Sequence, residues 1–137
     1  DFTYNGQSLI KQAPLTFTSW IKDVDFVYAG LDIVTLTSLN EGTPISLIEA
    51  QAANKPIVST NVGGIEDIVI PNETALLSKN GNPAEFVDNL LLLINDPNLR
   101  NKLSKGGYDF VCNKFDYKTL VENMKNLYYQ EYHNALS

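Results

Sequence analysis

Two carboxylates, Glu41 and Glu49, stand eight positions apart around a turn whose residue types suit a ligand. Glu41 lies in a loop after a strand-like run over residues 32–37, and Glu49 lies inside a helix-like run from Pro44 to Asn54. Ligands in open α/β sheets bind at the carboxyl ends of strands, which is where this turn would lie. If the helix is continuous, eight residues at about 100° each leave the two side chains roughly 80° apart. Both could then line one cleft.

The start of the predicted helix favours an anion. Thr43 suits the N-cap and Pro44 the first helical position. Backbone N–H groups near Gly42 to Ser46 would lack intrahelical partners, and the helix dipole favours negative charge beside them. A carboxylate at such a site is a poor phosphate ligand but a good acceptor for sugar hydroxyls. The turn therefore predicts a site for a phosphorylated, hydroxyl-rich molecule, and the alternative is a capping turn with two solvated glutamates.

The composition indicates one acidic domain with a sizeable core. The chain has 137 residues, 44% of them hydrophobic, and a formal net charge of −6 at pH 7. No cluster of Lys and Arg occurs, so nucleic acid is not expected as a partner. The single cysteine, Cys112, excludes an internal disulfide, suits a reducing compartment, and is expected to be a small buried residue. Without a signal peptide or a run of about 18 apolar residues, a cytoplasmic protein without a membrane span is expected.

Alternating strand-like and helix-like segments predict an α/β fold, a Rossmann-like parallel sheet flanked by helices, with further helices at the C-terminus. Strands are expected at Leu15–Trp20, Ile33–Thr37, Pro56–Thr60 and Thr74–Ser78. Helices are expected at Asp23–Gly30, Pro44–Asn54, after the Gly63-Gly64 turn, at Pro83–Ile94, at Asn98–Phe115 with a break around Gly106-Gly107, and at Tyr117–Asn134. Residues 7–12 suggest the tail of another helix. Four short strands are few for a complete domain, so residues 1–137 are expected to be one partial domain of a larger protein.

The segment from Ser38 to Val69 resembles the donor-binding segment of the retaining glycosyltransferase family 4. Glu41 and Glu49 meet the E-x7-E motif of that family, and the Gly-Gly turn follows at the matching distance. The matching residues are Asp32-Ile33, Ser38, Glu41-Gly42-Thr43-Pro44, Leu47, Glu49-Ala50 and the run Ala53–Glu66. Thr18-Ser19-Trp20, Asp23-Val24, Asp96-Pro97, Leu99-Arg100 and Phe115 extend the resemblance to roughly residues 14–135. The resemblance implies a GT-B fold, two Rossmann-like domains facing across a cleft, with this chain in the C-terminal one.

The resemblance also implies a role for each matching position. Glu41, the candidate catalytic residue, would accept hydrogen bonds from the donor hexose, and Glu49 would bind the ribose hydroxyls. The backbone of Gly42, Thr43 and Pro44 would meet sugar hydroxyls and the diphosphate, and Ser46 and Leu47 would offer N–H groups to phosphate. Trp20 would lie near the nucleobase. Gly63 and Gly64 would place the next helix against the cleft, although they could form only a tight turn.

The implied reaction is transfer of a hexose from a nucleotide diphosphate sugar to a saccharide or lipid-linked acceptor, with the anomeric configuration retained. Neither a metal nor another cofactor is expected. The family's diphosphate-binding Arg and Lys and its N-terminal domain have no counterpart in these residues, so the chain alone should be inactive. Peripheral membrane association of the parent protein stays open. The alternative is a non-catalytic nucleotide-sugar-binding module, and a nucleotide-sugar epimerase with the GT-B fold ranks third because it would lack E-x7-E.

Three other features receive structural interpretations. Asp23-Val24-Asp25 is formally a metal-binding D-x-D, but it begins a helix, where Asp23 would act as a cap. His133 is expected to be a solvated surface residue. The tyrosines of the last predicted helix are expected to pack rather than to bind sugar, partly as interdomain surface; they are Tyr128, Tyr129 and Tyr132.

Overall fold

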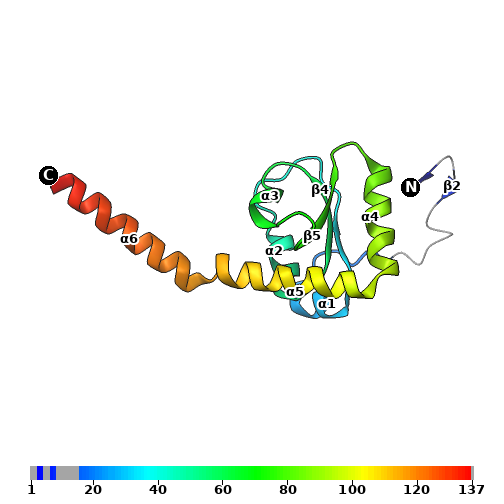
Figure 1. Cartoon of the computed structure of the whole chain (residues 1–137), viewed down its shortest axis with the longest axis horizontal. Coiled ribbons are helices and arrows are strands. Elements are labelled where there is room, and N and C mark those ends of the chain that lie inside the picture. Colours follow the sequence, from blue (N-terminus) through cyan, green and yellow to red (C-terminus); the bar gives the residue numbers. More distant parts are fainter. Residues whose placement is uncertain (1–2, 5–6, 9–15, 137) are drawn as a thin grey trace.

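The computed structural model describes residues 3–4, 7–8 and 16–136 and confirms the predicted α/β fold. A three-stranded parallel sheet with the order β3-β4-β5 forms its centre (Figure 1). The strands are β3 (Val34–Leu36), β4 (Ile57–Asn61) and β5 (Ala75–Lys79). Val34 of β3 pairs with Ile57, which pairs with Ala75, so the three strands end at the same edge of the sheet.

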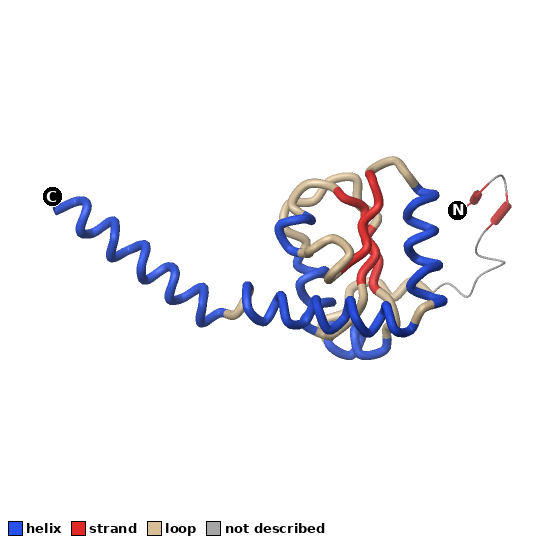
Figure 2. The backbone as a smooth tube through the Cα atoms, viewed as in Figure 1, coloured by secondary structure: helices blue, strands red, loops and turns tan. Residues whose placement is uncertain are grey.

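Helices cover both faces of this sheet (Figures 1 and 2). In chain order they are α1 (Val24–Gly30), α2 (Ile45–Ala52), α3 (Ile65–Ile68), α4 (Pro83–Asn95), α5 (Pro97–Lys114) and α6 (Tyr117–Leu136). In Figure 2 the sheet lies between α4 on one side and α2 and α3 on the other. A separate antiparallel ribbon joins β1 (Thr3–Tyr4) to β2 (Gln7–Ser8).

Alternate side chains of the strands build two separate cores. Ile57 and Ala75 belong to a buried cluster that also contains Leu47 of α2 and Ile65 of α3. Their neighbours in the strands point the other way: Val58 and Leu76 pack with Leu93 of α4 and Leu103 of α5. This alternation follows from the two-residue period of a strand. Because both faces of such a strand are buried, its sequence is a nearly continuous run of apolar residues rather than an alternation of apolar and polar ones.

Two predictions near the N-terminus are wrong where the structure tests them. The strand expected at Leu15–Trp20 does not form over 16–20, whose side chains are all exposed, and Leu15 lies outside the described residues. A β-prone sequence gains little as a strand unless a neighbouring strand pairs with it. The expected helix tail over residues 7–12 is wrong at Gln7-Ser8, which form β2, and the rest of that segment lies outside the described residues.

The predicted break at Gly106-Gly107 is also wrong, because α5 is continuous from Pro97 to Lys114. These glycines instead allow close packing. A Cβ added at Gly106 would lie 2.5 Å from the backbone oxygen of Glu73, and one at Gly107 would lie 2.9 Å from Cγ of the buried Gln51. The Gln51 amide nitrogen donates to the Ile68 carbonyl at 2.8 Å, so α5, α2 and α3 meet around this side chain.

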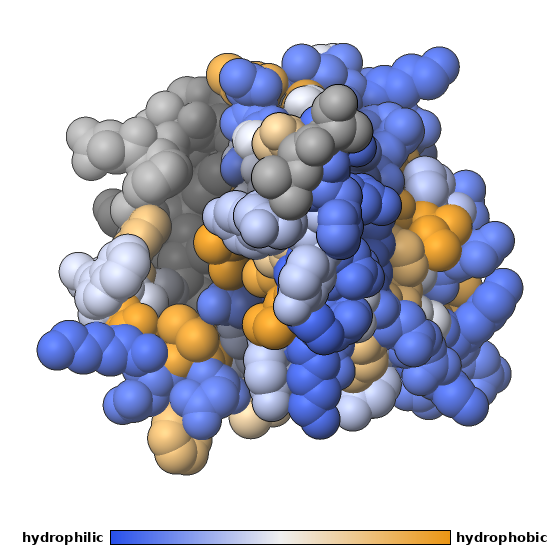
Figure 3. Space-filling view, turned by 90° about the vertical axis from the view of Figure 1, so that its left-hand side faces the viewer, coloured by the Kyte–Doolittle hydropathy of each residue, from blue (hydrophilic) through white to orange (hydrophobic). Residues whose placement is uncertain are grey.

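The last helix, α6, extends away from the rest of the fold (Figures 1 and 2). Its described side chains are exposed, including the three tyrosines expected to pack: Tyr128, Tyr129 and Tyr132. Within this chain the packing prediction is therefore wrong, whereas His133 is exposed as expected. Figure 3, from the side toward which α6 extends, shows separate apolar groups among hydrophilic residues. Within the described part of the chain, no helix combines the length and apolar character needed to cross a bilayer.

We predict that Gly106→Ala destabilises the fold by up to about 2 kcal/mol. Alanine gains about 1 kcal/mol in helix propensity, but overpacking typically costs about 1–3 kcal/mol, and the atom in its way is a backbone oxygen that cannot rotate aside. Urea unfolding measures the difference. Gly30→Ala is the matched control, because no atom lies within 4 Å of its added Cβ. Equal stabilities for the two variants would contradict the packing explanation.

Candidate functional site

The strand–loop–helix turn that carries the two glutamates forms at the carboxyl end of β3. Glu41 lies in the loop before α2 and Glu49 inside α2, each partly buried. One detail of the prediction is wrong: Pro44, not Thr43, is the N-cap, and α2 begins at Ile45 without a side-chain cap. The Pro44 carbonyl accepts from the Leu47 N–H at 3.0 Å, which closes the first turn without help from the exposed Thr43.

The carboxylate of Glu41 is held by its own loop. The hydroxyl of Ser38 donates a short hydrogen bond to Glu41 Oε1. The carbonyl of Ser38 in turn accepts from Thr60 Oγ1 of β4 at 2.8 Å. Glu41 is thus tied through Ser38 to the middle strand of the sheet, which fixes its position relative to the fold.

The Gly63-Gly64 turn after β4 packs directly on the backbone of the Glu41 loop. The Gly64 N–H donates to the Glu41 carbonyl at 3.1 Å. A Cβ at Gly63 would overlap that same carbonyl oxygen, and one at Gly64 would overlap the carbonyl oxygen of Gly42. Gly63 also has a φ of +53°, a conformation that L side chains rarely adopt. The two glycines are therefore required for contact between the loops, and Gly64 is the N-cap position of α3.

Glu49 has a partner from a different element. The hydroxyl of Tyr28, on α1, lies 3.2 Å from Glu49 Oε2 and 2.9 Å from the carbonyl oxygen of Ser46. Burial of the ring, followed by the charge of Glu49 and its hydrogen bond, raises the pKa of Tyr28 to about 12. The phenol is therefore protonated at neutral pH and acts as the donor, so the Glu49 carboxylate acts as the acceptor.

A hollow of about 790 Å³ lies beside this pair, between α1, α2 and residues 18–22. Trp20, Ser46 and Glu49, three of the predicted site residues, line it together with Tyr28 and Lys22. The side chain of Trp20 is 89% exposed and therefore available for contact with a ligand. Its neighbour in the lining, Ser19, has a φ of +57°, which is uncommon outside glycine and often marks a ligand site.

The other predicted site residues lie outside this hollow. Glu41 is not in its lining, so the structure does not place both carboxylates in one hollow. The same holds for Gly42, Thr43, Pro44, Leu47, Gly63 and Gly64. The side chain of Leu47 is fully buried in the core, and its backbone N–H donates to the Pro44 carbonyl. The candidate site thus has two separate parts, the hollow around Glu49 and the paired loops around Glu41.

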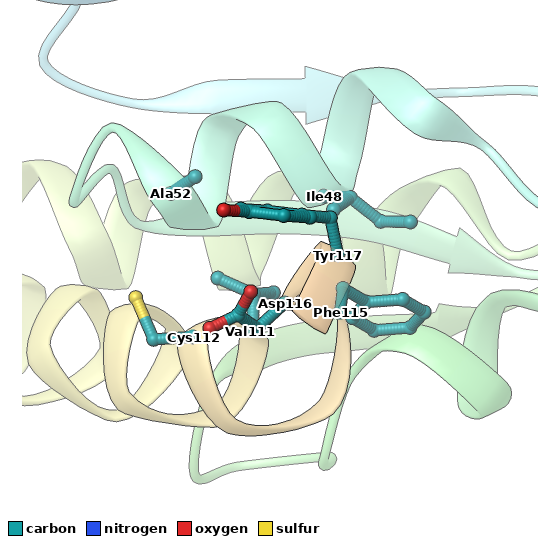
Figure 4. Close-up of a pocket in the computed structure, with 7 residues that line it drawn as sticks. All are labelled: Ile48, Ala52, Val111, Cys112, Phe115, Asp116 and Tyr117. Carbon is teal, nitrogen blue, oxygen red and sulfur yellow. The ribbon is translucent and has the colours of Figure 1, made fainter. Parts of the chain in front are cut away.

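A second hollow, of about 420 Å³, lies between α2, the C-terminal end of α5 and the start of α6 (Figure 4). Ile48 and Ala52 of α2 line it with Val111 and Cys112 of α5, and the ring of Tyr117 extends over them. Cys112 is exposed here, so the prediction that it is buried is wrong. The hollow has a single carboxylate, Asp116, and we assign it no ligand.

The residues 23–25 lie at the start of α1, as expected. Asp23 is the N-cap position of α1, but its side chain makes no capping hydrogen bond, so its predicted capping role is wrong. Among the residues that the structure describes, no three His, Cys, Asp or Glu side chains gather closely enough to hold a metal ion.

Sequence reasoning missed Tyr28, Ser38 as a partner of Glu41, and Lys22. Ser38 was visible as a matching position, but its bond to Glu41 depends on the loop conformation. Tyr28 lies on another helix, 21 positions before Glu49, where no local spacing reveals the contact. Its one sequence signal is a tyrosine with a polar tip within an otherwise largely apolar helical segment.

Comparisons with known proteins agree on a family. A family model described as glycosyl transferases group 1 matches residues 6–110. An uncharacterized glycosyltransferase, MJ1178 of Methanocaldococcus jannaschii, is 33% identical over 95 residues, which cover 69% of this chain and 27% of that protein. The chain therefore spans little more than a quarter of the length of this relative.

Solved structures share the fold. The C-terminal domain of a group 1 glycosyl transferase, LpcC of Francisella tularensis, is 29% identical with a TM-score of 0.65, covering 74% of this chain and 52% of that one. HepE of Anabaena, solved in complex with UDP, has a TM-score of 0.76 at 21% identity, covering 80% of this chain and 30% of that one. Both are consistent with a GT-B C-terminal domain.

We predict that Gly63→Ala destabilises the fold more than Gly81→Ala does. Both glycines have positive φ, so both variants incur about 1–2 kcal/mol of backbone strain. Only at Gly63 does the added Cβ also overlap a backbone oxygen, whereas nothing lies within 4 Å at Gly81. Chemical unfolding of both variants measures the difference, and a Gly63→Ala protein no less stable than Gly81→Ala would argue against contact between the loops.

We also predict that Tyr28 titrates late in the folded protein. Its pKa is about 12 in the fold and 10.0 in an unperturbed tyrosine. The unfolded chain therefore ionises first, so the stability that the protonated phenol contributes is complete below about pH 10 and is lost between pH 10 and 12. Phenolate absorbance is measured against pH for the unchanged protein and for Tyr28→Phe, and the difference between the two curves gives the titration of Tyr28. A Tyr28 that ionises with the exposed tyrosines would contradict its contact with Glu49.

Proposed function

Because the chain belongs to the group 1 glycosyl transferases, we propose that it forms the donor-binding part of a retaining hexosyltransferase that uses a nucleotide diphosphate sugar. One observation carries the proposal. The acceptor-only carboxylate of Glu49 lies beside a hollow that also contains exposed Trp20 and the start of α2. These groups suit, in turn, sugar hydroxyls, a planar base and phosphate.

In the proposed complex the nucleoside lies in the hollow. Glu49 accepts hydrogen bonds from the ribose hydroxyls, and the nucleobase lies near Trp20. The diphosphate meets the backbone N–H group of Ser46, at the start of a helix that has no side-chain cap. The Leu47 N–H, expected to have the same role, donates to the Pro44 carbonyl instead. An uncapped helix N-terminus favours an anion by its dipole. UDP in the complex of HepE is a nucleoside diphosphate of the proposed class, bound to a protein of the same fold.

The hexose is proposed to extend toward the paired loops. There Glu41 accepts hydrogen bonds from its hydroxyls, and the backbone of Gly42, Thr43 and Pro44 lies alongside the sugar and the diphosphate. Gly63 and Gly64 contribute by holding this backbone in place. The hydrogen bond from Ser38 keeps the Glu41 carboxylate oriented before the donor arrives, which lowers the cost of ordering it on binding.

The proposed reaction proceeds on one face of the sugar. The bond between the anomeric carbon and the diphosphate breaks as the acceptor hydroxyl bonds to the same face, and the departing phosphate oxygen takes the hydroxyl proton. Negative charge grows on that phosphate, and the N-terminus of α2 stabilises part of it. The remaining positive charge and the acceptor site are proposed to come from other parts of the whole protein, including an N-terminal domain. No metal or other cofactor is part of the proposal.

The acceptor is proposed to be a saccharide or a lipid-linked saccharide, in a cytoplasmic protein that could associate peripherally with a membrane. Retention, the hexose and the acceptor rest on the resemblance to family 4 rather than on the geometry of this chain. Binding of the nucleotide sugar without transfer to any acceptor would favour the alternative of a non-catalytic binding module.

The test is a calorimetric titration with UDP, GDP, ADP and their sugars, using the protein with any native sequence that flanks this chain. Glu49→Ala should weaken binding of the preferred nucleoside diphosphate by about 1–3 kcal/mol, the cost of losing a charged hydrogen-bond partner. Glu41→Ala should spare the nucleoside diphosphate and weaken only the nucleotide sugar. Glu131→Ala, which removes the same charge from exposed α6, is the control. No binding in the panel, or an unchanged affinity in Glu49→Ala, would refute the assignment.

A further inference from the structure

We propose that Tyr28 is a positioning residue that holds Glu49 in the orientation in which it distinguishes ribose from deoxyribose. The inference rests on the proposed function, because it assumes that Glu49 faces the ribose. It adds a residue from α1 to a site otherwise built from residues 18–22, α2 and the loops after β3 and β4.

The contacts of the Tyr28 hydroxyl fix it at two points of α2. It lies 3.2 Å from Glu49 Oε2 and 2.9 Å from the Ser46 carbonyl oxygen, both acceptors on the same helix. A hydroxyl has one proton, so the two acceptors share it. The Glu49 side chain is thereby drawn toward the hydroxyl, at the side of α2 that borders the hollow.

The tyrosine itself is well anchored. Its ring is half-buried and packs against the hydrophobic cluster that contains Val34 and Leu47. The next residue, Ala29, accepts a hydrogen bond through its carbonyl from Lys55 Nζ at 3.2 Å, which ties the end of α1 to the segment after α2. A donor with so little freedom can hold a flexible carboxylate, whose side chain otherwise loses rotamer entropy when a ligand orders it.

The division of donor and acceptor roles then selects the ligand. The protonated phenol donates to Oε2, and a carboxylate has about four lone-pair sites, which leaves Oε1 able to accept from a ligand. Glu49 can only accept, so the ligand must donate, as a ribose hydroxyl does. A 2′- or 3′-deoxyribose lacks one such donor and should lose affinity where the carboxylate is held in place.

The test compares four proteins, Tyr28→Phe, Glu49→Gln, the double variant and the unchanged protein, in the full form used above. The probes are UDP, 2′-deoxy-UDP and 3′-deoxy-UDP, or the corresponding GDP or ADP set if that base binds more tightly. Tyr28→Phe keeps the ring and removes only the hydroxyl. Tyr129→Phe removes the same hydroxyl from an exposed tyrosine of α6 and serves as the control.

We expect Tyr28→Phe to weaken binding of the ribonucleotide by about 2- to 10-fold, the usual range for one hydrogen bond. Binding of the deoxyribonucleotides should weaken much less. The ratio of ribo to deoxyribo affinity should fall, and Tyr28→Phe should add little in the Glu49→Gln background. A purely structural role would weaken all probes alike. An unchanged ratio, or fully additive effects of the two substitutions, would overturn the inference.

A second variant retains Tyr28, so that the test does not depend on whether Tyr28→Phe folds. Glu49→Asp keeps the charge but withdraws the carboxylate by one methylene from the Tyr28 hydroxyl, and should also lower the ratio of ribo to deoxyribo affinity. The two hypotheses fail differently. If Glu49→Ala leaves the affinity for UDP unchanged, the proposed ribose contact is refuted. If Glu49→Ala weakens UDP binding but neither Tyr28→Phe nor Glu49→Asp changes the ratio of ribo to deoxyribo affinity, only the role of Tyr28 is refuted.

Discussion

The contact between two loop backbones at the carboxyl end of the sheet is the constraint on which the candidate site depends. The Gly64 N–H meets the Glu41 carbonyl, and there is no space for a side chain at Gly63 or Gly64. Backbone groups in such contact cannot adjust by changing rotamers, so the loop after β3 takes its shape from the loop after β4. Parallel strands make this possible because their carboxyl ends meet at one edge.

The two glutamates are held by different means, which suits different tasks. Glu41 is fixed by its own loop through Ser38, so its position follows the local backbone. Glu49 is fixed by Tyr28, a side chain from a helix earlier in the chain, so its position depends on how α1 packs against α2. A movement of α1 could release Glu49 and leave Glu41 in place.

Local patterns predicted the parts of this structure that local physics determines. The α/β class, the three strands of the sheet and the turn that carries Glu41 follow from apolar runs, glycines and prolines, with boundaries within about two residues. Contacts between distant segments were not predictable from spacing. Residues 16–20 do not form the expected strand, the glycines of α5 are packing positions rather than a break, and Tyr28 reaches Glu49 from another helix.

Gly107 of α5 also affects the position of Glu49. α2 carries Glu49, which lines the hollow, and the buried Gln51, which lies against Gly107 of α5. The position of α2 therefore depends on its packing against α5, a helix that does not line the hollow. A bulkier residue at Gly107 would meet the Gln51 side chain and so press on α2, two positions from Glu49. A substitution at Gly107 could thus change the position of Glu49 without replacing any residue that lines the hollow.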